Sequence, residues 1–370
     1  MRILLLGEYS NVHATLAKGL KRLGHEVLVV SNGDFWKDYD RDVSLVRKPG
    51  LWGALCYTVK LLALLPRLRN YDIVQLINPM FLELKAQRIS LVYKYLRKHN
   101  KKVFLGAFGM DYYWIHICDT LKPLRYSDFN IGDELRHNED ADRERNDWIG
   151  TDKERLNKMI AYDCDGIIAG LYEYWACYRL AFPDKTTFIP FPVEMPSGEE
   201  QPDHHGLQST EKPRKTRIFI GINKQRSAYK GTDIMLQAAE HVMALHPDLM
   251  TLRKAESVPF SQYRQMINES DAILDQLYSY TPSMNSLLAM SKGIIDIGGG
   301  EPENYEILDE TELKPIINVE PDYDSVVGQL EQLILHPEQI PVLKRQSVEY
   351  VRKHHDYMKV ARQYIEAFTR

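Results

Sequence analysis

Three cationic residues stand in a short loop whose composition suits the binding of a diphosphate. The stretch RIFIGINKQRSAYKG, residues 217–231, runs from an apolar strand pattern into a loop with Lys224, Arg226 and Lys230. A helical pattern, GTDIMLQAAEHVMAL, begins at Gly231. Ligands of open α/β sheets gather where strands end, and the next helix would add its positive N-terminal dipole. The alternative is a surface loop whose Lys and Arg side chains are simply solvated.

The composition is that of a globular protein with more than one domain. The chain has 370 residues, 44% of them hydrophobic and 26% charged, which disfavours disorder, collagen and coiled coil. At roughly 150 residues per domain, this length predicts two or three domains, and we favour two. The four cysteines have no CxxC spacing, so we expect no zinc site, no disulfides and a reducing, cytoplasmic compartment. We expect no leader before the first strand, and no segment has the roughly 18 apolar residues of a membrane-spanning helix.

Positive charge is concentrated in the first part of the chain. Residues 1–102 contain 18 Lys+Arg and 8 Asp+Glu, although the net charge of the whole chain is −4. The apolar stretch LWGALCYTVKLLALLP has basic residues in and around it: Arg47, Lys48, Lys60, Arg67 and Arg69. This combination is typical of a helix that lies on an anionic membrane, and a buried helix with solvated flanks is the alternative. We expect no nucleic-acid partner, because the aromatic interleaving of stacking platforms is missing.

The apolar pattern predicts two α/β domains. Residues 2–31 have the pattern of a strand, a helix and a second strand, and the alternation then continues, which predicts a parallel, doubly wound sheet. The expected organisation is an N-terminal Rossmann-like domain, a polar linker, a second Rossmann-like domain and a C-terminal helix that returns to the first domain: 1–196, 197–216, 217–350 and 351–370. No GxGxxG follows either first strand and no Walker loop is present, so we expect no cofactor.

Several motifs in this order resemble the two-domain GT-B glycosyltransferases. They are the helix ending KRLGHEV, the loop with Arg226 and Lys230-Gly231, and the run LLAMSKGIIDIGG. Within that class the chain resembles the retaining family 4, or group 1, enzymes, which include bacterial mannosyl- and glucosyltransferases with lipid-linked or polysaccharide acceptors. The resemblance covers nearly the whole chain and is weakest between about residues 112 and 150. It implies two domains facing a cleft, with the acceptor bound by the first and a nucleotide sugar by the second.

The resemblance assigns a donor site. In the family, a first-domain glycine loop approaches the donor, and an Arg and a Lys from the second domain bind its diphosphate. The corresponding residues here are Gly7, Glu8, Arg226, Lys230 and Gly231. The segment YTPSMNS resembles the second phosphate-binding turn of the family, and its candidate residues are Ser283, Met284, Asn285 and Ser286. The alternative is a Ser-capped helix with no ligand. We expect no metal, so cations and helix ends would meet the charge of the leaving group.

Two positions in the second half depart from the family pattern. Family members usually have glutamates where this chain has Tyr280 and Leu288, and the second of them holds the ribose of the nucleotide. Leucine cannot accept hydrogen bonds from ribose hydroxyls. The segment GGGEPENYE offers Glu301, Glu303 and Glu306 as replacements, of which Glu303 is the preferred candidate. A solvated acidic loop is the alternative.

The first half also departs from the family pattern, in the segment Phe108-Gly109-Met110-Asp111. Phe108 replaces a histidine that is common in relatives, whereas Asp111 is retained. We therefore expect Asp111 to act in catalysis with Arg226 and Lys230, and the alternative is that it caps a helix or turn. The aromatic stretch that follows is typical of an acceptor-binding loop. Its candidate acceptor-binding residues are Asp111, Tyr112 and His116.

The resemblance favours a hexosyltransferase that uses a nucleotide-sugar donor and a glycan or lipid-linked acceptor. Its reaction would be retaining and metal-independent, and would serve the synthesis of a bacterial surface polysaccharide at the inner face of the membrane. The first alternative is a protein of the same fold that binds sugar nucleotides or glycans without turnover, because of Tyr280, Leu288 and Phe108. A sugar-nucleotide epimerase is the second alternative, although the carboxylates and histidines for its acid and base chemistry are scarce.

Overall fold

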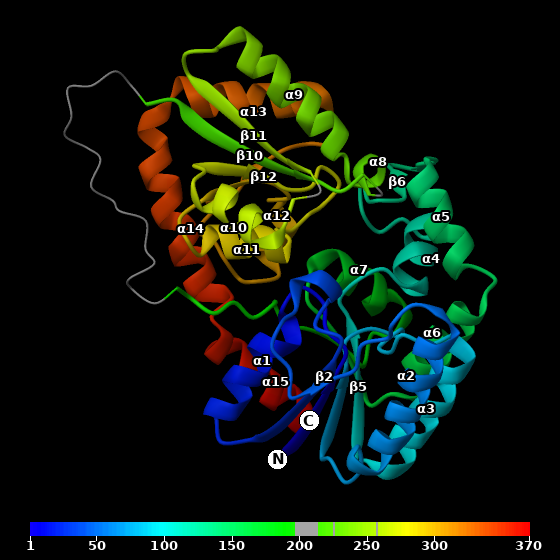
Figure 1. Cartoon of the computed structure of the whole chain (residues 1–370). Coiled ribbons are helices and arrows are strands. Elements are labelled where there is room, and N and C mark those ends of the chain that lie inside the picture. Colours follow the sequence, from blue (N-terminus) through cyan, green and yellow to red (C-terminus); the bar gives the residue numbers. More distant parts are fainter. Residues whose placement is uncertain (197–213, 225, 257) are drawn as a thin grey trace. The chain divides into compact units, whose positions relative to one another are not determined.

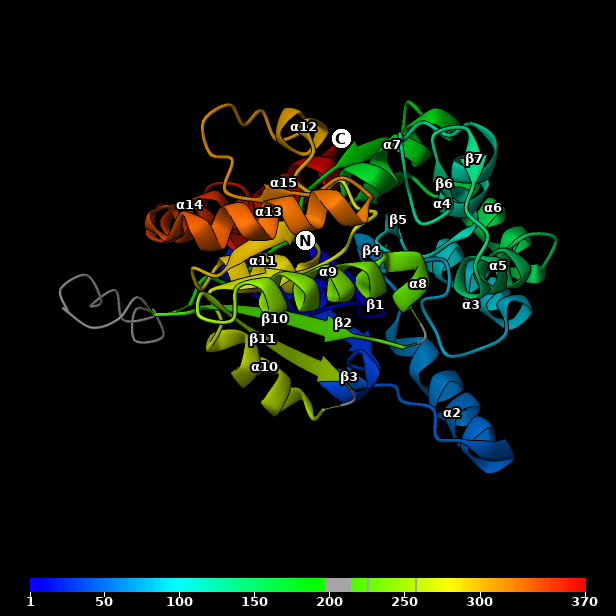
Figure 2. The ribbon, with the colours of Figure 1, turned by 90° about the horizontal axis from the view of Figure 1, so that it is seen from above.

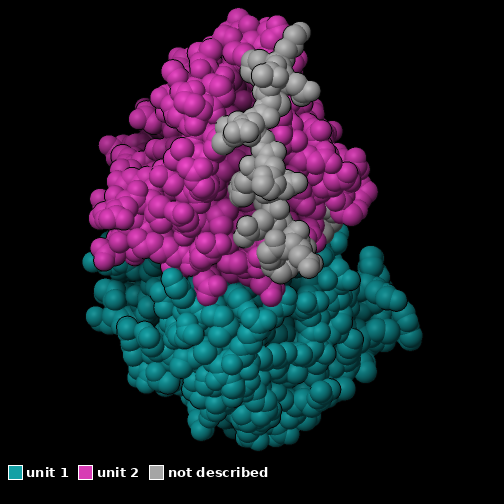
Figure 3. Space-filling model, turned by 90° about the vertical axis from the view of Figure 1, so that its left-hand side faces the viewer, with its two compact units in different colours: residues 1–123, 143–192, 357–370 teal, residues 124–142, 193–356 magenta. Residues whose placement is uncertain are grey.

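The chain folds into two compact units. The computed structural model describes residues 1–196, 214–224, 226–256 and 258–370 (Figure 1). Unit 1 consists of residues 1–123, 143–192 and 357–370, and unit 2 of residues 124–142 and 193–356 (Figure 3). Each unit has its own sheet and its own hydrophobic core.

Unit 1 is built, within its described residues, on a seven-stranded parallel sheet with the order β3-β2-β1-β4-β5-β8-β9. Its strands are β1 (Arg2–Leu6), β2 (Glu26–Ser31), β3 (Val43–Ser44), β4 (Ile73–Leu76), β5 (Lys102–Ala107), β8 (Gly166–Ala169) and β9 (Thr186–Phe188). In the central strand β1, Ile3 to Leu6 are almost fully buried, as expected of a parallel strand with helices on both faces. β3 is an edge strand of two residues, and Pro49, which follows it, has no N–H for a ladder.

The helices of unit 1 lie on both sides of this sheet (Figure 1). They are α1 (Val12–Arg22), α2 (Gly50–Leu64), α3 (Ala86–His99), α4 (Tyr112–Thr120), α5 (Glu139–Trp148, shared with unit 2), α6 (Asp152–Asp163), α7 (Tyr172–Ala181) and α15 (Tyr357–Thr369), with the 3-10 turns η1 (Phe35–Lys37) and η2 (Leu65–Arg67). The last helix, α15, packs against α1, and Phe368 lies against Phe104 with ring centroids 4.9 Å apart. The C-terminal segment is therefore part of unit 1.

Unit 2 has, among its described residues, a five-stranded parallel sheet in the order β11-β10-β12-β13-β14. The strands are β10 (Thr216–Ile222), β11 (Met250–Glu256), β12 (Ala272–Leu274), β13 (Ile295–Gly298) and β14 (Ile317–Asn318). The helices are α8 (Ser227–Lys230), α9 (Thr232–Leu245), α10 (Phe260–Asn268), α11 (Met284–Met290), α12 (Pro302–Glu306), α13 (Tyr323–Leu335), α14 (Ile340–His354) and the 3-10 turn η4 (Pro337–Gln339). Helices α9 and α13 pack together, as do α11 and α14, and a core around Phe219 and Ile273 lies between sheet and helices.

One segment of unit 2 comes from the first half of the sequence. Residues 124–142, with the antiparallel strands β6 (Asn130–Ile131) and β7 (Glu134–Leu135), leave unit 1 after α4 and belong to unit 2. The organisation expected from the sequence placed them in a continuous domain 1–196. Buried contacts of Tyr126 and Arg136 with residues of unit 2 explain why they belong there. The larger part of the expected linker, residues 197–213, lies outside the described residues.

Candidate functional site

The loop between β10 and α9 has the local structure that the sequence suggested for binding a diphosphate. β10 ends at Ile222, the single turn α8 covers Ser227–Lys230, and α9 starts at Thr232. Gly231 joins the two helices with φ +70°, in the left-handed region. A Cβ at this position would lie 2.6 Å from Cβ of Leu277 and 2.7 Å from the Tyr278 ring. Any other residue would therefore strain the backbone and clash with the neighbouring loop.

The three cations of this loop differ in their surroundings. Lys230 is half-buried, and its Nζ donates a hydrogen bond to Oε1 of Gln276, just after β12. Arg226 is exposed at the start of α8, where its carbonyl accepts from the Lys230 backbone N–H at 3.2 Å. Lys224 forms an ion pair of 2.5 Å with Glu256 at the end of β11, which raises the pKa of this lysine. Lys230 is thus the cation that the fold holds between two loops.

Loops from three neighbouring strands meet at the carboxyl edge of the unit 2 sheet. The Leu277 N–H donates to the Lys230 carbonyl at 2.9 Å, which joins the loops after β12 and β10. The Glu301 N–H donates to the Tyr280 carbonyl at 3.2 Å, which joins the loops after β13 and β12. Parallel α/β sheets bind ligands at this edge. The structure therefore places the predicted residues Lys230, Ser283 and Glu303 on adjoining loops of one edge.

The turn before α11 has its polar side chains bound to other protein groups. Ser283 caps α11, and its N–H and Oγ donate to the two carboxylate oxygens of Asp275 at 3.0 and 2.8 Å. Ser286 is fully buried and donates to Oδ1 of Asp296 at 2.7 Å. In the described residues Oδ2 of Asp296 has no partner, and burial raises the pKa of this carboxyl. The carboxylate of Asp275 lies at the N-terminus of α11, where a negative charge is favourable.

The other two predicted residues of this turn are placed differently. Nδ2 of Asn285 donates to the hydroxyl of Tyr263 at 3.0 Å, and the Asn285 side chain is half-buried. Met284 is buried. Of the predicted donor-binding residues in this turn, Ser283 and Asn285 are half-buried, whereas Met284 and Ser286 are buried.

The acidic loop after β13 is bound by the segment 124–142. Arg125 donates to Oε2 of Glu301 at 2.6 Å and to Oε1 of Glu303 at 2.5 Å. Oε1 of Glu301 accepts from the hydroxyl of Tyr126 and from Nδ2 of Asn318. The predicted alternative, a solvated acidic loop, therefore holds only for Glu306, which is exposed. The two carboxylates that could replace the missing family glutamates are neutralised by a residue the sequence did not single out.

Tyr280 occupies the position of the first family glutamate and takes part in the same contact. Its side chain is buried, its hydroxyl accepts the Arg125 N–H at 2.7 Å, and its ring lies 5.0 Å from the Arg125 guanidinium. Burial raises its pKa to about 12. Tyr280 therefore supports the segment 124–142 from the position of the first family glutamate.

Arg136 fixes the same segment to the predicted diphosphate loop. Its guanidinium lies 3.3 Å from the centroid of the Tyr278 ring and donates to the carbonyls of Ala228 and Tyr229 in α8 at 3.0 and 2.9 Å. Burial lowers the pKa of Arg136. A cation at the carbonyl end of a short helix is favourable. One signal for such a role can be found in the sequence, where the stretch ELRHNEDADRER contains many charged residues.

In unit 1, the glycine loop after β1 surrounds a buried acid. Gly7 has φ +84°, and a Cβ there would lie 2.2 Å from Cγ2 of Ile77. Glu8 accepts from the N–H groups of His13 and Ala14 at 3.2 and 2.8 Å, at the N-terminus of α1. Burial raises the pKa of Glu8 to about 8. Glu8 is therefore protonated in much of its population at neutral pH.

His13 is a candidate functional residue that the sequence analysis did not identify. Its Nδ1 lies 2.8 Å from the Gly7 carbonyl, which can only accept, so Nδ1 holds the proton. Its Nε2 is buried and has no partner among the described residues. Burial lowers the pKa of His13 to about 4, and its ring lies 6.5 Å from that of Phe108 in an edge-on arrangement. A neutral histidine thus adjoins the phenylalanine that replaces the family histidine.

Asp111 caps a helix. It is fully buried at the N-terminus of α4, where Oδ1 accepts the Trp114 N–H at 2.9 Å and Oδ2 accepts the Tyr178 hydroxyl at 2.8 Å. Burial raises its pKa to about 7. The structure thus shows the helix cap that the sequence analysis gave as the alternative. A catalytic role for Asp111 stays a prediction.

Tyr112 and His116 lie together one turn apart on α4. Their rings stack at 4.9 Å, and Nζ of Lys158 lies 4.6 Å from the Tyr112 ring. Tyr112 is buried and His116 is half-buried. His116 is therefore the predicted acceptor-binding residue with the greater access to solvent.

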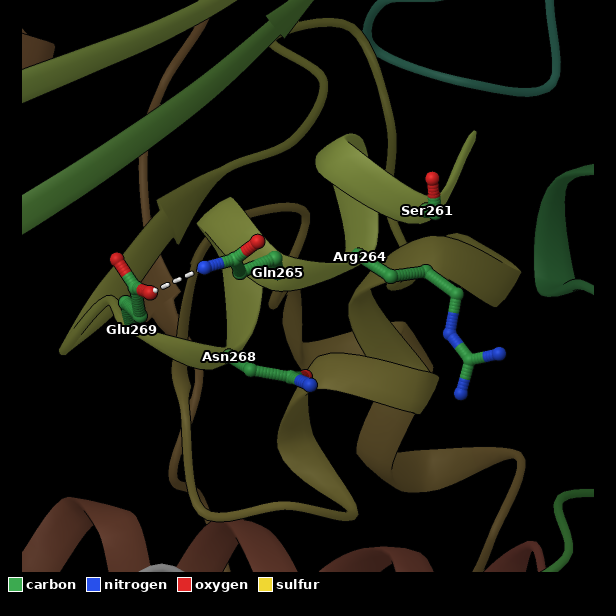
Figure 4. A pocket seen from close by; sticks show the side chains of 5 residues that line it. All are labelled: Ser261, Arg264, Gln265, Asn268 and Glu269. Atoms are coloured by element: carbon green, nitrogen blue, oxygen red, sulfur yellow. Dashed lines mark hydrogen bonds between the residues drawn. The ribbon is translucent and has the colours of Figure 1, made fainter. Parts of the chain in front are cut away.

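A hollow elsewhere on unit 2 is separate from these loops. It has a volume of about 430 Å³ and is lined by residues of α10 and its end: Ser261, Arg264, Gln265, Asn268 and Glu269 (Figure 4). None of them was predicted as a site residue. Among the described residues, no group of His, Cys, Asp and Glu could hold a metal ion, and no helix is long and apolar enough to cross a membrane.

Comparison with solved structures finds proteins of similar fold. No protein-family model matches the chain, and no curated protein matches it. Anabaena Alr3699/HepE, solved with UDP-glucose, is 11% identical with a TM-score of 0.59 over 100% of this chain and 99% of its own. Sucrose-phosphate synthase from Thermosynechococcus elongatus is 13% identical, with a TM-score of 0.62 over 100% and 98%. UDP-GlcNAc 2-epimerase from Neisseria meningitidis, solved with UDP-GlcNAc, is 11% identical, with a TM-score of 0.53 over 100% of both chains.

At these identities the likeness shows the fold. The chain has the α/β fold of the GT-B glycosyltransferases, with two parallel-sheet domains, and this confirms the predicted fold class. The retaining family 4 subtype, the cleft between the domains and the individual site residues stay predictions.

Proposed function

We propose that this protein is a glycosyltransferase that moves a hexose from a nucleotide sugar to a glycan or lipid-linked acceptor. The observation that supports this most strongly is the meeting of three loops at the carboxyl edge of the unit 2 sheet, with Lys230 held between two of them. The fold is shared with Alr3699/HepE, which was solved with UDP-glucose. The setting we propose is bacterial surface polysaccharide synthesis in the cytoplasm, at the inner face of the membrane.

In the proposed reaction, Lys230 and Arg226 bind the diphosphate and stabilise its charge as it leaves. Fixed cations at a developing negative charge lower the barrier of such transfers. The reaction is proposed to retain the anomeric configuration, because the leaving phosphate can itself accept the proton of the acceptor hydroxyl. We propose that it is metal-independent, because two cations would do the work of charge neutralisation. Tyr112 and His116 are proposed to contact the acceptor.

Calorimetric titration with UDP-, GDP- and ADP-sugars tests the donor site. Lys230→Ala is expected to weaken binding of the preferred donor at least tenfold, since a charge-assisted contact contributes roughly 1.5–3 kcal/mol. Lys215→Ala is the matched control, because Lys215 is exposed at the opposite end of β10 and donates to the Pro247 carbonyl. Equal donor affinity in wild type and Lys230→Ala would contradict the assignment.

A binding protein without turnover is the second candidate. It is favoured by one observation: Arg125 occupies the two carboxylates, Glu301 and Glu303, that could have bound the ribose. Incubation of the protein with its preferred donor and a panel of acceptors distinguishes the candidates. Transfer to an acceptor supports the first, and tight binding with neither transfer nor donor hydrolysis supports the second.

The same incubation without acceptor examines epimerisation, the activity named for the Neisseria neighbour. If NMR detects an epimerised nucleotide sugar, epimerisation would replace sugar transfer as the proposed activity. NMR of a transfer product gives the anomeric configuration, and unchanged turnover in EDTA supports metal independence.

A further inference from the structure

Helix α2 of unit 1 exposes an unusual amount of apolar surface. One side is buried and includes Gly53, Tyr57, Leu61 and Leu64. The other side is exposed: Leu51 92%, Trp52 75%, Leu55 53%, Val59 58% and Leu62 60%. Single exposed apolar residues are common, whereas five on one helix are not.

The exposed residues form one stripe. Their spacing of i, i+1, i+4, i+8 and i+11 places them within an arc of about 100° on a helix of 3.6 residues per turn. The buried residues fall on the opposite side of the same helix. Figure 2 shows α2 at the periphery of unit 1, directed away from its sheet. The stripe therefore faces away from the core that holds the helix.

The charge around the stripe has one sign. Between residues 43 and 71 the sequence contains five basic residues and no acidic one. All five are exposed: Arg47, Lys48, Lys60, Arg67 and Arg69. Lys60 donates to the Ser44 carbonyl at 2.6 Å, and one acid from outside the segment, Glu83, accepts the Arg47 backbone N–H at 2.9 Å. The surface around the stripe is therefore strongly cationic.

We propose that α2 and its basic neighbours bind the surface of an anionic membrane. The stripe would enter the boundary between headgroups and acyl chains, while the five cations contact anionic headgroups. Trp52 is suited to this layer because its ring is amphipathic. With 15 residues, α2 is about 22 Å long, which is shorter than the roughly 30 Å hydrocarbon core, so it lies on the membrane and does not span it.

The charge favours a membrane over a second copy of the chain. A symmetric dimer through this stripe would use the same patch twice and bring five cations toward five cations. Like charges placed against each other oppose association. An anionic bilayer offers both an apolar layer and the opposite charge. This inference goes beyond the proposed sugar transfer and does not depend on it.

Binding of the full-length protein to lipid vesicles tests the proposal. Vesicles of phosphatidylcholine alone and with added phosphatidylglycerol are sedimented with the protein at low and high salt. We expect binding to the anionic vesicles only, weakened by salt because screening reduces attraction to headgroups. The double variant Leu51→Ser/Trp52→Ser is expected to bind roughly tenfold more weakly or worse. Arg47→Gln/Lys48→Gln should reduce both the binding and its dependence on salt.

The matched control is Leu91→Ser, because Leu91 is 66% exposed on α3, outside the stripe. It should bind vesicles like the wild type. Circular dichroism confirms that the variants fold, and donor titration without vesicles shows whether the nucleotide site is intact, so failure of either proposal is recognised separately. Absence of wild-type binding to anionic vesicles would overturn the inference. A wild-type dimer that Leu51→Ser/Trp52→Ser converts to a monomer, with no vesicle binding, would overturn it in favour of a second copy.

Discussion

The carboxylates at the strand ends of the two units are stabilised in different ways. In unit 1, Glu8 follows β1 and Asp111 follows β5, and both are buried with backbone N–H groups and a tyrosine hydroxyl as partners. In unit 2, Glu301 and Glu303 follow β13 and share Arg125. Glu8 and Asp111 of unit 1 are thus neutral or nearly neutral helix caps, whereas Glu301 and Glu303 of unit 2 are paired with a cation.

The pKa values follow this difference. Burial raises the pKa of Glu8 to about 8 and that of Asp111 to about 7. Burial would also raise the pKa of Asp271 in unit 2, but hydrogen bonds from Arg217 and the charge of Lys344 outweigh it and lower the pKa to about 2. A cation, more than burial, therefore decides whether an acid stays charged here.

The largest expected effect is a fall in the stability of unit 1 as pH rises. Folded Glu8 and Asp111 hold protons at a pH where the unfolded chain has released them. Their contribution to the free energy of unfolding is fully present below about pH 4. It is lost as the pH rises to about 7 for Asp111 and to about 8 for Glu8. Each acid changes the free energy of unfolding by up to about 1.4 kcal/mol per pH unit within its window. Hydrogen exchange of α1 and α4 between pH 5 and 9 measures this.

The control for this pH dependence is the double variant Glu8→Gln/Asp111→Asn, which removes both titrating groups. In this variant the stability of unit 1 should change much less between pH 5 and 9. A profile that keeps its slope in this variant would show that other groups cause it.

The next effect is expected at Asp271. Asp271→Asn removes the charge that Lys344, Arg217 and Arg214 surround, so we expect a loss of about 2–3 kcal/mol at pH 7. Urea denaturation followed by circular dichroism measures it. Lys98→Gln removes an exposed charge for which the structure gives no ion pair among the described residues, and it should change stability by less than about 0.5 kcal/mol. A loss at Asp271→Asn no greater than in this control would contradict the comparison.

A smaller and more local effect is expected for Arg125→Ala. The variant leaves Glu301, which is 6% exposed, without its cation, although Tyr126 and Asn318 still bind it. Because Arg125 is itself more than half exposed, we expect only about 1–2 kcal/mol. Faster hydrogen exchange in residues 124–142, with unchanged exchange in α9, would locate the loss. Unchanged protection of that segment would show that its other contacts, such as those of Tyr126 and Arg136, hold it without Arg125.

The smallest effect is expected for Glu8→Gln. The amide keeps the shape, and its single oxygen can accept one of the N–H groups of His13 and Ala14, which donate to different oxygens of Glu8. Near pH 4 the acid that it replaces is also neutral in the folded protein. Near pH 4, where Glu8 is protonated in both the folded and the unfolded chain, we expect a loss of less than about 1 kcal/mol, in contrast to Asp271→Asn. Thermal unfolding of the two variants side by side measures the contrast. A large loss at Glu8→Gln would show that Glu8 is charged in the folded protein.

Much of the fold could be predicted from the sequence. The helical pattern that begins at Gly231 is α9, Thr232–Leu245, and the apolar strand pattern before the loop is β10, Thr216–Ile222. The position of Lys230 after a strand end could also be read from the chain. These features depend on patterns within short segments, where apolar spacing and turn residues express local preferences.

The partners of the site residues could not be predicted in this way. Ser286 was expected to reach an anion, but it is buried and donates to Asp296. Glu303 was expected to face the ribose, but it binds Arg125. Nothing in the sequence near Arg125 indicates which distant acid it meets.

The sequence by itself determined the alternation of strands and helices, the cations of the loop 223–231 and the cationic, apolar composition of α2, because each is a property of a continuous segment. Only the tertiary structure decided that the segment 124–142 belongs to unit 2 and that Arg125 pairs with Glu301, 176 residues away. The tertiary structure also decided which side of α2 remains exposed. The physical reason is that burial and charge pairing depend on which distant segments fold against each other, and local patterns do not specify this.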